Sequence, residues 1–333
     1  MRAIVTGSSG FIGSALSQKL LDQGWDVFGI DSHSDYYAIS LKELRLASLV
    51  KNRKFKFVPL DLSLSNDFAK ILSEVNPQAV FHLAAQAGVR IPTEQLEKYV
   101  SSNLVAFSNV LQACITQEIP NFLFASSSSV YGDQASLPYS EKEINLRPNS
   151  FYGGTKLANE ILAGTLAPTS KTRIRGMRFF TVYGPMGRPD MAYFRIISSL
   201  LAGTKFELFG NGTVERDFTY INDCVSMITL LEAELRSHPN GFSDIVNIGG
   251  GHPTSMNTLI SIVQNQFGSE MKYKIGLPNQ KDVLRTMADS SYLVSLVGDK
   301  PSTSLEVGIG LTIDWAKDSS INQELRSWVD SSI

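Results

Sequence analysis

The sequence predicts an α/β fold, with a doubly wound parallel sheet and a smaller C-terminal α/β lobe. Short β-rich runs alternate with helical patterns over residues 1–130, and strands in such an order need crossover helices between them. The runs lack a strict polar alternation, which is typical of a sheet that helices cover on both faces. After Thr181 the chain becomes rich in glycine and proline turns, so we expect the second lobe to begin there.

The expected elements follow one another in a regular order. Residues 11–23 are predicted to form a helix because Ile12, Leu16 and Leu20 recur at helical spacing. Strands are expected at residues 3–6, 26–30, 55–60, 79–83, 122–126, 174–180 and 245–248, and further helices at 66–75, 100–116 and 152–166. Because the last strand could return to the large sheet, the expected domains are residues 1–180, with a returning segment near 217–249, and residues 181–333.

Length and composition exclude several classes of protein. A chain of 333 residues suffices for about two domains. Its 30 Lys and Arg residues are balanced by 32 Asp and Glu residues, so no basic surface for nucleic acid is expected. No apolar run approaches the ~20 residues of a membrane span, and the first residues lack signal-peptide features, so we expect a cytoplasmic protein. The two cysteines, Cys114 and Cys224, lie far apart, which favours a reducing compartment and no metal site.

A glycine-rich segment lies between the first expected strand and the first expected helix. Gly7, Gly10 and Gly13 permit a tight turn in which backbone N–H groups reach a pyrophosphate at the helix N-terminus. The spacing is GxxGxxG, so the alternative is a close strand-to-helix turn without a ligand. Asp31 ends the second strand about 20 residues later, where a carboxylate binds ribose hydroxyls and repels a 2′-phosphate. The two features together predict NAD as the cofactor in preference to NADP.

A tyrosine and a lysine stand four residues apart on the helix expected at 152–166. Tyr152 and Lys156 therefore share one helix face, where the lysine cation could favour the tyrosine phenolate as a general base. The pair alone is equally compatible with a solvated helix face. Ser127 strengthens the catalytic interpretation, because it ends a predicted strand at the edge where open α/β sheets bind their ligands. Its hydroxyl could hydrogen-bond a substrate hydroxyl beside the tyrosine.

Together these residues resemble the extended short-chain dehydrogenase/reductase family, which has a Rossmann-type NAD-binding domain and a nucleotide-sugar-binding lobe. The resemblance extends to residues 82–90, 130–132 and 216–221 and covers nearly the whole chain. It implies the catalytic residues Tyr152, Lys156 and Ser127. The cofactor contacts expected from the glycine turn and the resemblance are Gly7, Gly10, Phe11, Ile12, Gly13, Asp31, Asp61, Leu62, Leu83, Ala84, Tyr152 and Lys156.

Within this family the chain is most similar to the bacterial UDP-glucuronate 4-epimerases. The similarity lies in residues 29–31, 35–37, 41–42, 125–132, 178–185 and 187–192. Departures from the epimerase pattern occur at Met186, where these enzymes usually have tryptophan, at residues 32–34, and at residues 280–283 near Lys281. The related 4,6-dehydratases and UDP-glucuronate decarboxylases carry acidic residues just after the catalytic Ser or Thr. Ser128 and Ser129 occupy those positions here, which argues against both reactions.

The resemblance implies NAD-dependent 4-epimerisation of UDP-glucuronate through a 4-keto sugar, in a homodimer. The substrate contacts that it implies are Ser127, Ser128, Ser129, Thr181, Arg188, Phe209 and Arg216. Arg188 is the expected partner of the sugar carboxylate, because a guanidinium can bind a carboxylate in bidentate fashion; a loop ion pair is its alternative. Two other functions stay open: a 4-epimerase of neutral UDP-hexoses, and a catalytically silent NAD-binding sensor. His82 is expected to be structural, and Arg90 could face either sugar or solvent.

Overall fold

A seven-stranded parallel sheet forms the centre of the molecule in the computed structural model, which describes residues 1–64, 67–88, 93–277 and 283–330. Arg90 and residues 280–282, singled out above, lie outside the described residues. The strand order is β10-β6-β5-β4-β1-β2-β3, and every neighbouring pair is parallel. The strands are β1 (Arg2–Thr6), β2 (Asp26–Asp31), β3 (Phe55–Pro59), β4 (Ala79–His82), β5 (Asn121–Ser127), β6 (Arg173–Phe179) and β10 (Ser243–Ile248). The doubly wound parallel sheet predicted from the sequence is confirmed.

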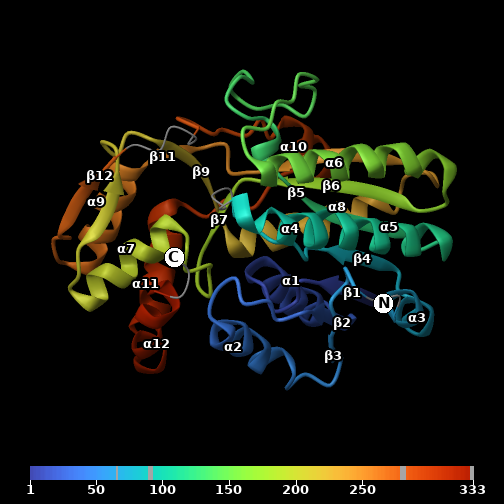
Figure 1. The fold of residues 1–333 in the computed structure, drawn as a ribbon, viewed down its shortest axis with the longest axis horizontal. Helices are drawn as coiled ribbons and strands as arrows, with labels where there is room; N and C mark the ends of the chain where they lie inside the picture. Colours follow the sequence, from blue (N-terminus) through green and yellow to red (C-terminus); the bar gives the residue numbers. More distant parts are fainter. Residues whose placement is uncertain (65–66, 89–92, 278–282, 331–333) are drawn as a thin grey trace.

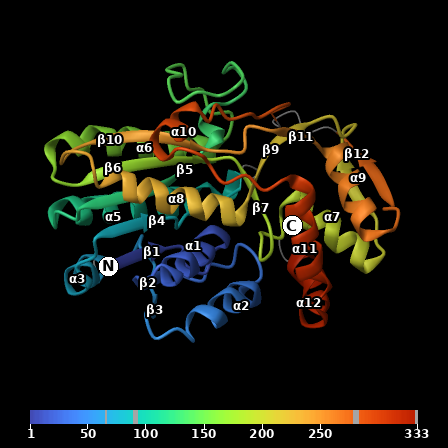
Figure 2. The ribbon, with the colours of Figure 1, turned by 180° about the vertical axis from the view of Figure 1, so that it is seen from behind.

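Helices cover both faces of this sheet (Figures 1 and 2). One face packs against α1 (Phe11–Asp22), α2 (Ile39–Leu49) and α8 (Ile221–Leu235), and the other against α3 (Asp67–Val75), α5 (Ala106–Thr116) and α6 (Phe151–Leu166). Short helices join them: η1 (Thr93–Gln95), α4 (Leu96–Tyr99), the π-helix η2 (Val100–Val105), η3 (Ser128–Val130) and η4 (Ala167–Thr169). The buried strands carry apolar side chains on both sides, which explains their lack of polar alternation.

The second lobe lies beside the carboxyl ends of the central strands, at the left of Figure 1. A three-stranded sheet of order β11-β9-β7 contains β7 (Thr181–Tyr183), β9 (Glu215–Tyr220) and β11 (Pro253–Ser255). A two-stranded sheet pairs β8 (Phe206–Phe209) with β12 (Tyr273–Gly276). The helices of this part are α7 (Ala192–Ala202), α9 (Met256–Phe267), α11 (Leu305–Lys317) and α12 (Ser319–Asp330). The chain thus leaves the central sheet after β6 and returns to it at β10.

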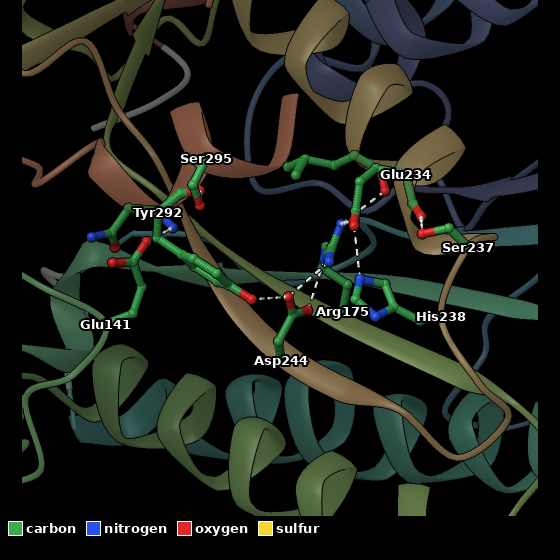
Figure 3. A network of polar contacts seen from close by, with 10 residues as sticks. Glu141, Arg175, Glu234, Ser237, His238, Asp244, Tyr292 and Ser295 are labelled. Atoms are coloured by element: carbon green, nitrogen blue, oxygen red, sulfur yellow. Dashed lines mark hydrogen bonds and ion pairs between the residues drawn. The ribbon is translucent and has the colours of Figure 1, made fainter. Parts of the chain in front are cut away.

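A buried ionic network fastens the returning segment to the central sheet (Figure 3). Arg175 on β6 donates from Nε and Nη2 to the two carboxylate oxygens of Asp244 on β10, both at 2.7 Å. Its Nη1 donates to Glu234 of α8 at 2.7 Å, and Glu234 also contacts His238 at 2.7 Å. Tyr292 of α10 (Ser291–Val297) donates to Asp244 at 2.8 Å. These ion pairs and hydrogen bonds hold β6, α8 and α10 around β10 at the edge of the sheet.

Two features of the first half differ from the sequence prediction. The helix α2 was not expected; its N-cap Ala38 has no side-chain cap, so the usual signal for a helix start is missing. The helix expected at residues 100–116 is divided into the π-helix η2 and α5. Asn103 is buried in η2, where its side chain bonds the backbone of Gln86 and the hydroxyl of Thr155. These tertiary contacts accompany the local widening of the helix.

Candidate active site

The glycine turn is too crowded for side chains. A Cβ atom on Gly13 would lie 2.0 Å from the carbonyl oxygen of Gly7, and one on Gly7 would lie 2.8 Å from the amide nitrogen of Ala84. Gly7 also has φ +72°, which favours glycine. The N-cap residue Gly10 offers no side-chain cap to the 12-residue helix α1. The turn therefore lets a ligand come close to the backbone at the N-terminus of α1, where the first N–H groups of the helix have no intrahelical acceptor. This arrangement fits a pyrophosphate. Phe11 is buried at the helix start, and Ile12 follows it partly buried.

Asp31 lies at the carboxyl end of β2, beside the glycine turn. Its Oδ2 accepts a hydrogen bond from the Ser9 amide at 3.1 Å, and its Oδ1 accepts one from the His33 amide at 2.8 Å. The carboxylate is partly exposed, so it retains lone pairs that can accept from ribose hydroxyls. Its charge would repel a 2′-phosphate. The observed position therefore fits NAD.

The remaining expected cofactor contacts follow two neighbouring strands. Asp61 and Leu62 follow β3 after one intervening residue, Leu60, and Asp61 accepts hydrogen bonds from the amide and hydroxyl of Ser63. Leu83 and Ala84 follow β4, and their amides donate to the backbone and side-chain oxygens of Thr6 respectively. All four residues thus lie at the carboxyl edge of the sheet, on either side of β1, where α/β sheets bind dinucleotides.

His82 ends β4 without a catalytic arrangement around it. Its Nδ1 lies 2.8 Å from the hydroxyl of Thr6, and its ring packs against the rings of Phe107 and Phe122. Burial lowers the pKa of His82 to about 3, so the ring is neutral at ordinary pH. These surroundings fit the structural role expected from the sequence. Within the described residues no group of three or more His, Cys, Asp or Glu side chains is placed to hold a metal ion.

Tyr152 and Lys156 lie on one face of α6, as their spacing predicts. Ser150 caps this helix by accepting from the Gly153 amide at 3.1 Å. Lys156 is 2% exposed, and its Nζ donates to the carbonyl of Ala125 at 2.8 Å. The same Nζ lies 5.8 Å from the centroid of the Tyr152 ring. Burial lowers the pKa of Lys156 to about 8, against an opposing effect of Glu160.

The electrostatic surroundings of Tyr152 include a cation from the second lobe. Burial raises the pKa of the phenol, whereas the charge of Arg188 and a hydrogen bond with Ser127 lower it. Lys156 is the cation expected from the sequence to favour the phenolate, but in the structure Arg188 is the cation that lowers the pKa of Tyr152, and Lys156 donates to the carbonyl of Ala125. Tyr152 thus stands where the central sheet and the second lobe meet.

Ser127 stands at the end of β5, 8% exposed, and begins a tight turn. Its Oγ accepts from the amide of Ser129 at 3.1 Å and lies 3.1 Å from the Ser129 hydroxyl. Ser128 and Ser129 are partly buried in η3, and the carbonyl of Ser128 accepts from the Tyr131 amide. Three consecutive hydroxyls therefore line the turn that follows β5, beside Tyr152.

Arg188 is already paired within the chain. Its Nε donates to Oδ1 of Asp190 at 3.0 Å, and its Nη2 donates to Oδ2 at 2.5 Å. The hydroxyl of Tyr36 donates to the same Oδ2 at 3.4 Å, and the Arg188 guanidinium carbon lies 5.9 Å from the Tyr36 ring centroid. Burial raises the pKa of Asp190, but the Arg188 guanidinium outweighs burial and holds it below its usual value.

Sequence reasoning missed Asp190 and Tyr36 as parts of the site. Asp190 stands two residues after Arg188, and this short spacing was a signal for the pair. Tyr36 lies in the loop between β2 and α2, so its arrival at Asp190 depends on the packing of the two lobes. The side-chain carboxylate of Asp190 already occupies much of the arginine fork predicted to bind the sugar carboxylate.

The other expected substrate contacts belong to the second lobe. Thr181 begins β7 and pairs with Phe218 in the three-stranded sheet. Phe209 ends β8 opposite Gly276. Arg216 lies on β9, and its Nη1 donates to the carbonyls of Glu215 at 2.9 Å and Val283 at 2.7 Å. The structure thus brings Ser127, Tyr152, Lys156 and Arg188 together, and it places Thr181, Phe209 and Arg216 on the strands of the two small sheets.

A buried ion pair supports α6 beneath the lysine. Glu160 accepts from Nε and Nη2 of Arg178 on β6, at 2.9 and 2.8 Å, and from the hydroxyl of Ser126. Glu160 follows Lys156 by one helical turn, so its charge also favours the protonated lysine. This arrangement joins α6 to β5 and β6, and it sets the depth at which Tyr152 and Lys156 stand over the sheet edge.

The chain is similar to known sugar-nucleotide epimerases along nearly its whole length. A probable UDP-glucuronate 4-epimerase from Rhizobium meliloti is 36% identical over 329 residues, covering 95% of this chain and 96% of the relative. The structure of UDP-glucuronic acid 4-epimerase from Bacillus cereus, with UDP-glucuronic acid and NAD, superposes with a TM-score of 0.88 at 34% identity, covering 95% and 99% of the two chains. A UDP-glucose 4-epimerase from Thermotoga maritima has a TM-score of 0.86 at 28% identity, with 96% and 100% covered. The model of the NAD-dependent epimerase/dehydratase family matches residues 3–249, and the chain belongs to this family.

Proposed function

We propose that this protein is an NAD-dependent isomerase that interconverts UDP-glucuronate and UDP-galacturonate through a transient 4-keto sugar. The observation that carries the proposal is the group formed by Ser127, Tyr152 and Lys156 at the carboxyl edge of the sheet, with Arg188 facing it from the second lobe. The glycine turn and Asp31 support NAD as the cofactor at the same edge. The similarity to UDP-glucuronate 4-epimerases supports the substrate.

Tyr152 is the proposed general base that removes the proton from O4 of the sugar. NAD held by the glycine turn and Asp31 would supply the hydride acceptor and donor for C4 of the sugar. Ser127 orients O4 through its hydroxyl, while the positive charge of Arg188 favours the tyrosine phenolate against the effect of burial. Lys156 supports the same step with its ammonium group. The keto sugar turns over between the two hydride transfers, so no cofactor is consumed.

The sugar carboxylate needs a fixed position, because a 4-keto uronic acid is a β-keto acid and loses carbon dioxide readily. Ser128, Ser129, Thr181 and Arg188 are the proposed contacts that hold the carboxylate away from the reactive alignment. Asp190 accepts hydrogen bonds from Nε and Nη2 of Arg188. Nη1 is therefore the guanidinium nitrogen that we propose to donate to the sugar carboxylate. Phe209 and Arg216 are the proposed contacts for uracil and diphosphate.

A neutral UDP-hexose is the second candidate substrate. Pairing with Asp190 reduces the net charge that Arg188 offers to a carboxylate, and a UDP-glucose 4-epimerase is among the structural neighbours. Both candidate reactions use Tyr152 in the same way. The sugar and not the chemistry therefore distinguishes them.

Purified protein incubated separately with UDP-glucuronate and UDP-glucose, and followed by proton NMR, tests the proposal. We expect UDP-galacturonate to form without stoichiometric NAD, because the hydride returns within each cycle. Formation of UDP-galactose alone would establish the neutral-hexose alternative. Accumulation of NADH would indicate a dehydrogenase, and absence of any turnover by NAD-loaded protein would favour a silent NAD-binding role.

The finer organisation is also proposed. Apolar side chains are exposed along α6 and along the π-helix η2 that contacts it. Ile161 is 61% exposed, and Phe151 and Val105 are each 41% exposed. A second copy packed on this face would bury them, so we assign a homodimer. We also assign residues 1–180, with the returning segment near 217–249, to the NAD domain and residues 181–333 mainly to the sugar lobe. Light scattering on Ile161→Glu, expected to be monomeric, tests the interface.

Buried free thiols at Cys114 and Cys224 support a cytoplasmic location. Among the described residues no helix is long and apolar enough to cross a membrane.

A further inference from the structure

One buried arginine joins the two lobes next to the candidate active site. Arg45 lies on α2 and is 2% exposed, which is unusual for an arginine. Its Nη1 donates to the carbonyl of Ser9 in the glycine turn at 3.2 Å and to the hydroxyl of Tyr37 at 2.6 Å. From the other side, Nε donates to the carbonyl of Met186 at 2.9 Å and Nη2 to the carbonyl of Gly187 at 3.0 Å. One guanidinium thus binds both the cofactor turn and the loop of the second lobe.

Two of the three carbonyls that Arg45 binds, those of Met186 and Gly187, belong to a strained turn. Met186 has φ +61°, a left-handed conformation that residues with a side chain adopt at a cost. A Cβ on Gly187 would lie 1.6 Å from the hydroxyl oxygen of Tyr193, so this turn is wrapped tightly around Tyr193. Such a conformation persists only where the surroundings hold it. Arg45 supplies two donors to consecutive carbonyls of this turn.

The residue that follows this turn is Arg188. Its guanidinium is oriented by Asp190, and Asp190 in turn accepts from Tyr36. Tyr36 and Arg45 both belong to the segment between β2 and the end of α2. This one segment of the NAD domain therefore contacts both ends of the loop 186–190.

The contacts differ from those of an ordinary buried ion pair. All four acceptors of Arg45 are neutral oxygens, whereas the buried arginines Arg175 and Arg178 each bind carboxylates. A buried cation is costly to desolvate when its acceptors are neutral. If the only requirement were to join two lobes, an apolar contact would serve with less desolvation. The planar fork instead fixes the direction of two adjacent carbonyls, which an apolar contact does not do.

We propose that Arg45 is a positioning residue that sets the loop 186–190, and thereby places Arg188 against Tyr152 and the substrate carboxylate. The inference rests on the proposed function, since it uses the uronate selectivity of Arg188 as its readout. Arg45 acts through the loop and does not touch the reacting atoms. Without Arg45, Arg188 should no longer stand in its correct position. Loss of Arg45 should therefore have the same consequence as loss of the Arg188 side chain.

A double-mutant cycle of Arg45→Met and Arg188→Ala tests this dependence. Each single variant is expected to lower kcat/KM for UDP-glucuronate by about tenfold or more, the effect of losing a charged hydrogen bond, with a smaller loss for a neutral UDP-hexose. The double variant is expected to be no worse than Arg188→Ala alone, because both changes remove one interaction. Multiplied losses, or equal losses on both sugars, would show that Arg45 is only structural and would overturn the inference.

Two further variants guard against simple unfolding. Tyr37→Phe removes one acceptor of Arg45 but keeps its bonds to the loop, so it should retain the uronate selectivity of the wild type. Arg45→Lys keeps the charge but loses the fork, so it should show an intermediate selectivity. Equal selectivity in Arg45→Lys, Arg45→Met and the wild type would contradict the positioning role.

A binding measurement separates this inference from the proposed function. In a Tyr152→Phe background, calorimetry with UDP-glucuronate and UDP-glucose reports affinity without turnover. Arg45→Met should weaken binding of UDP-glucuronate by about tenfold relative to UDP-glucose, while bound NAD and the melting temperature identify correctly folded protein. An unchanged ratio overturns the positioning role. If the protein with intact Arg45 and Arg188 neither prefers nor epimerises UDP-glucuronate, the proposed function itself has failed.

Discussion

The two sides of the candidate site are held in different ways. On the side of the central sheet, Tyr152 and Lys156 share one helix, which Glu160 and Arg178 fasten to the strands. On the side of the second lobe, Arg188 stands in a loop whose conformation depends on contacts with another part of the chain. The general acid–base chemistry therefore rests on regular secondary structure, and recognition of the sugar rests on a loop that side chains hold in place. Changes on the first side should affect all substrates alike. Changes on the second side should also distinguish among the sugars, because Arg188 both lowers the pKa of Tyr152 and is the proposed contact of the sugar carboxylate.

The largest effect is expected for Tyr152→Phe. This change removes the proton acceptor and keeps the ring, so epimerisation should fall by about 10²–10⁴-fold, the usual contribution of a general base. The glycine turn is untouched, so the NAD content measured after denaturation should equal that of the wild type. Turnover of any UDP-sugar at the wild-type rate would remove Tyr152 from the proposed mechanism.

Lys156 should lower the free energy of unfolding of the protein relative to an apolar side chain at the same position. Its pKa is about 8 in the folded protein and about 10.5 when unfolded, because burial disfavours the ammonium. A lowered lysine pKa means that the folded state binds fewer protons between these values, so stability rises with pH from about 8 to 10.5. Below pH 8 the cost is fully present, and Lys156→Met should raise the free energy of unfolding by up to about 3 kcal/mol at pH 7.

Denaturant unfolding of Lys156→Met at pH 7 and pH 10 measures this effect. The gain over the wild type should shrink at the higher pH, where the lysine is neutral in the folded protein. The exposed Lys51→Met is the matched control and should show no such pH-dependent gain. A stability gain that stays constant between the two pH values would mean that packing, and not the buried charge, causes it.

On the loop side, Arg188→Ala should discriminate between sugars. Loss of a charged hydrogen bond should reduce turnover of UDP-glucuronate by about ten- to 150-fold, and that of a neutral UDP-hexose by less. If Arg188 also holds the carboxylate of the keto sugar in place, the variant should release more decarboxylated UDP-pentose products, measured by NMR. Selective loss without such products would assign that control to Ser128, Ser129 and Thr181. Equal losses on both sugars would mean that Arg188 acts on the Tyr152 phenolate or as the partner of Asp190, and not on the sugar carboxylate.

The sequence could predict the parts of the molecule that depend on local pattern. The parallel sheet, the glycine turn, and the shared face of Tyr152 and Lys156 all follow from spacing within one or two adjacent elements. The contacts of Tyr36 and Arg45 with the second lobe could not be recognised in the same way. Their partners lie in distant segments, and only the docking of the second lobe on α2 brings Arg45 to the carbonyl of Met186. Likewise, the helix α2 lacks a capping signal, so tertiary packing and not its N-terminal sequence accounts for it.

The smallest effect is expected for Asp31→Ala, which tests the cofactor side of the site without touching sugar or base. The variant loses an acceptor for the ribose hydroxyls and a charge that opposes a 2′-phosphate, so the preference for NAD over NADP should fall by about tenfold, the effect of one hydrogen bond to a charged group. Titration of cofactor-free protein with each dinucleotide, followed by fluorescence, measures the ratio. The amides of Ser9 and His33 lose their acceptor in this variant, so affinity for both cofactors should also decrease. If both affinities decrease but the ratio of the affinities for NAD and NADP stays at the wild-type value, Asp31 shapes the turn and does not itself bind the ribose hydroxyls. Uronate selectivity should be unchanged in either case, because that property belongs to the opposite side of the site.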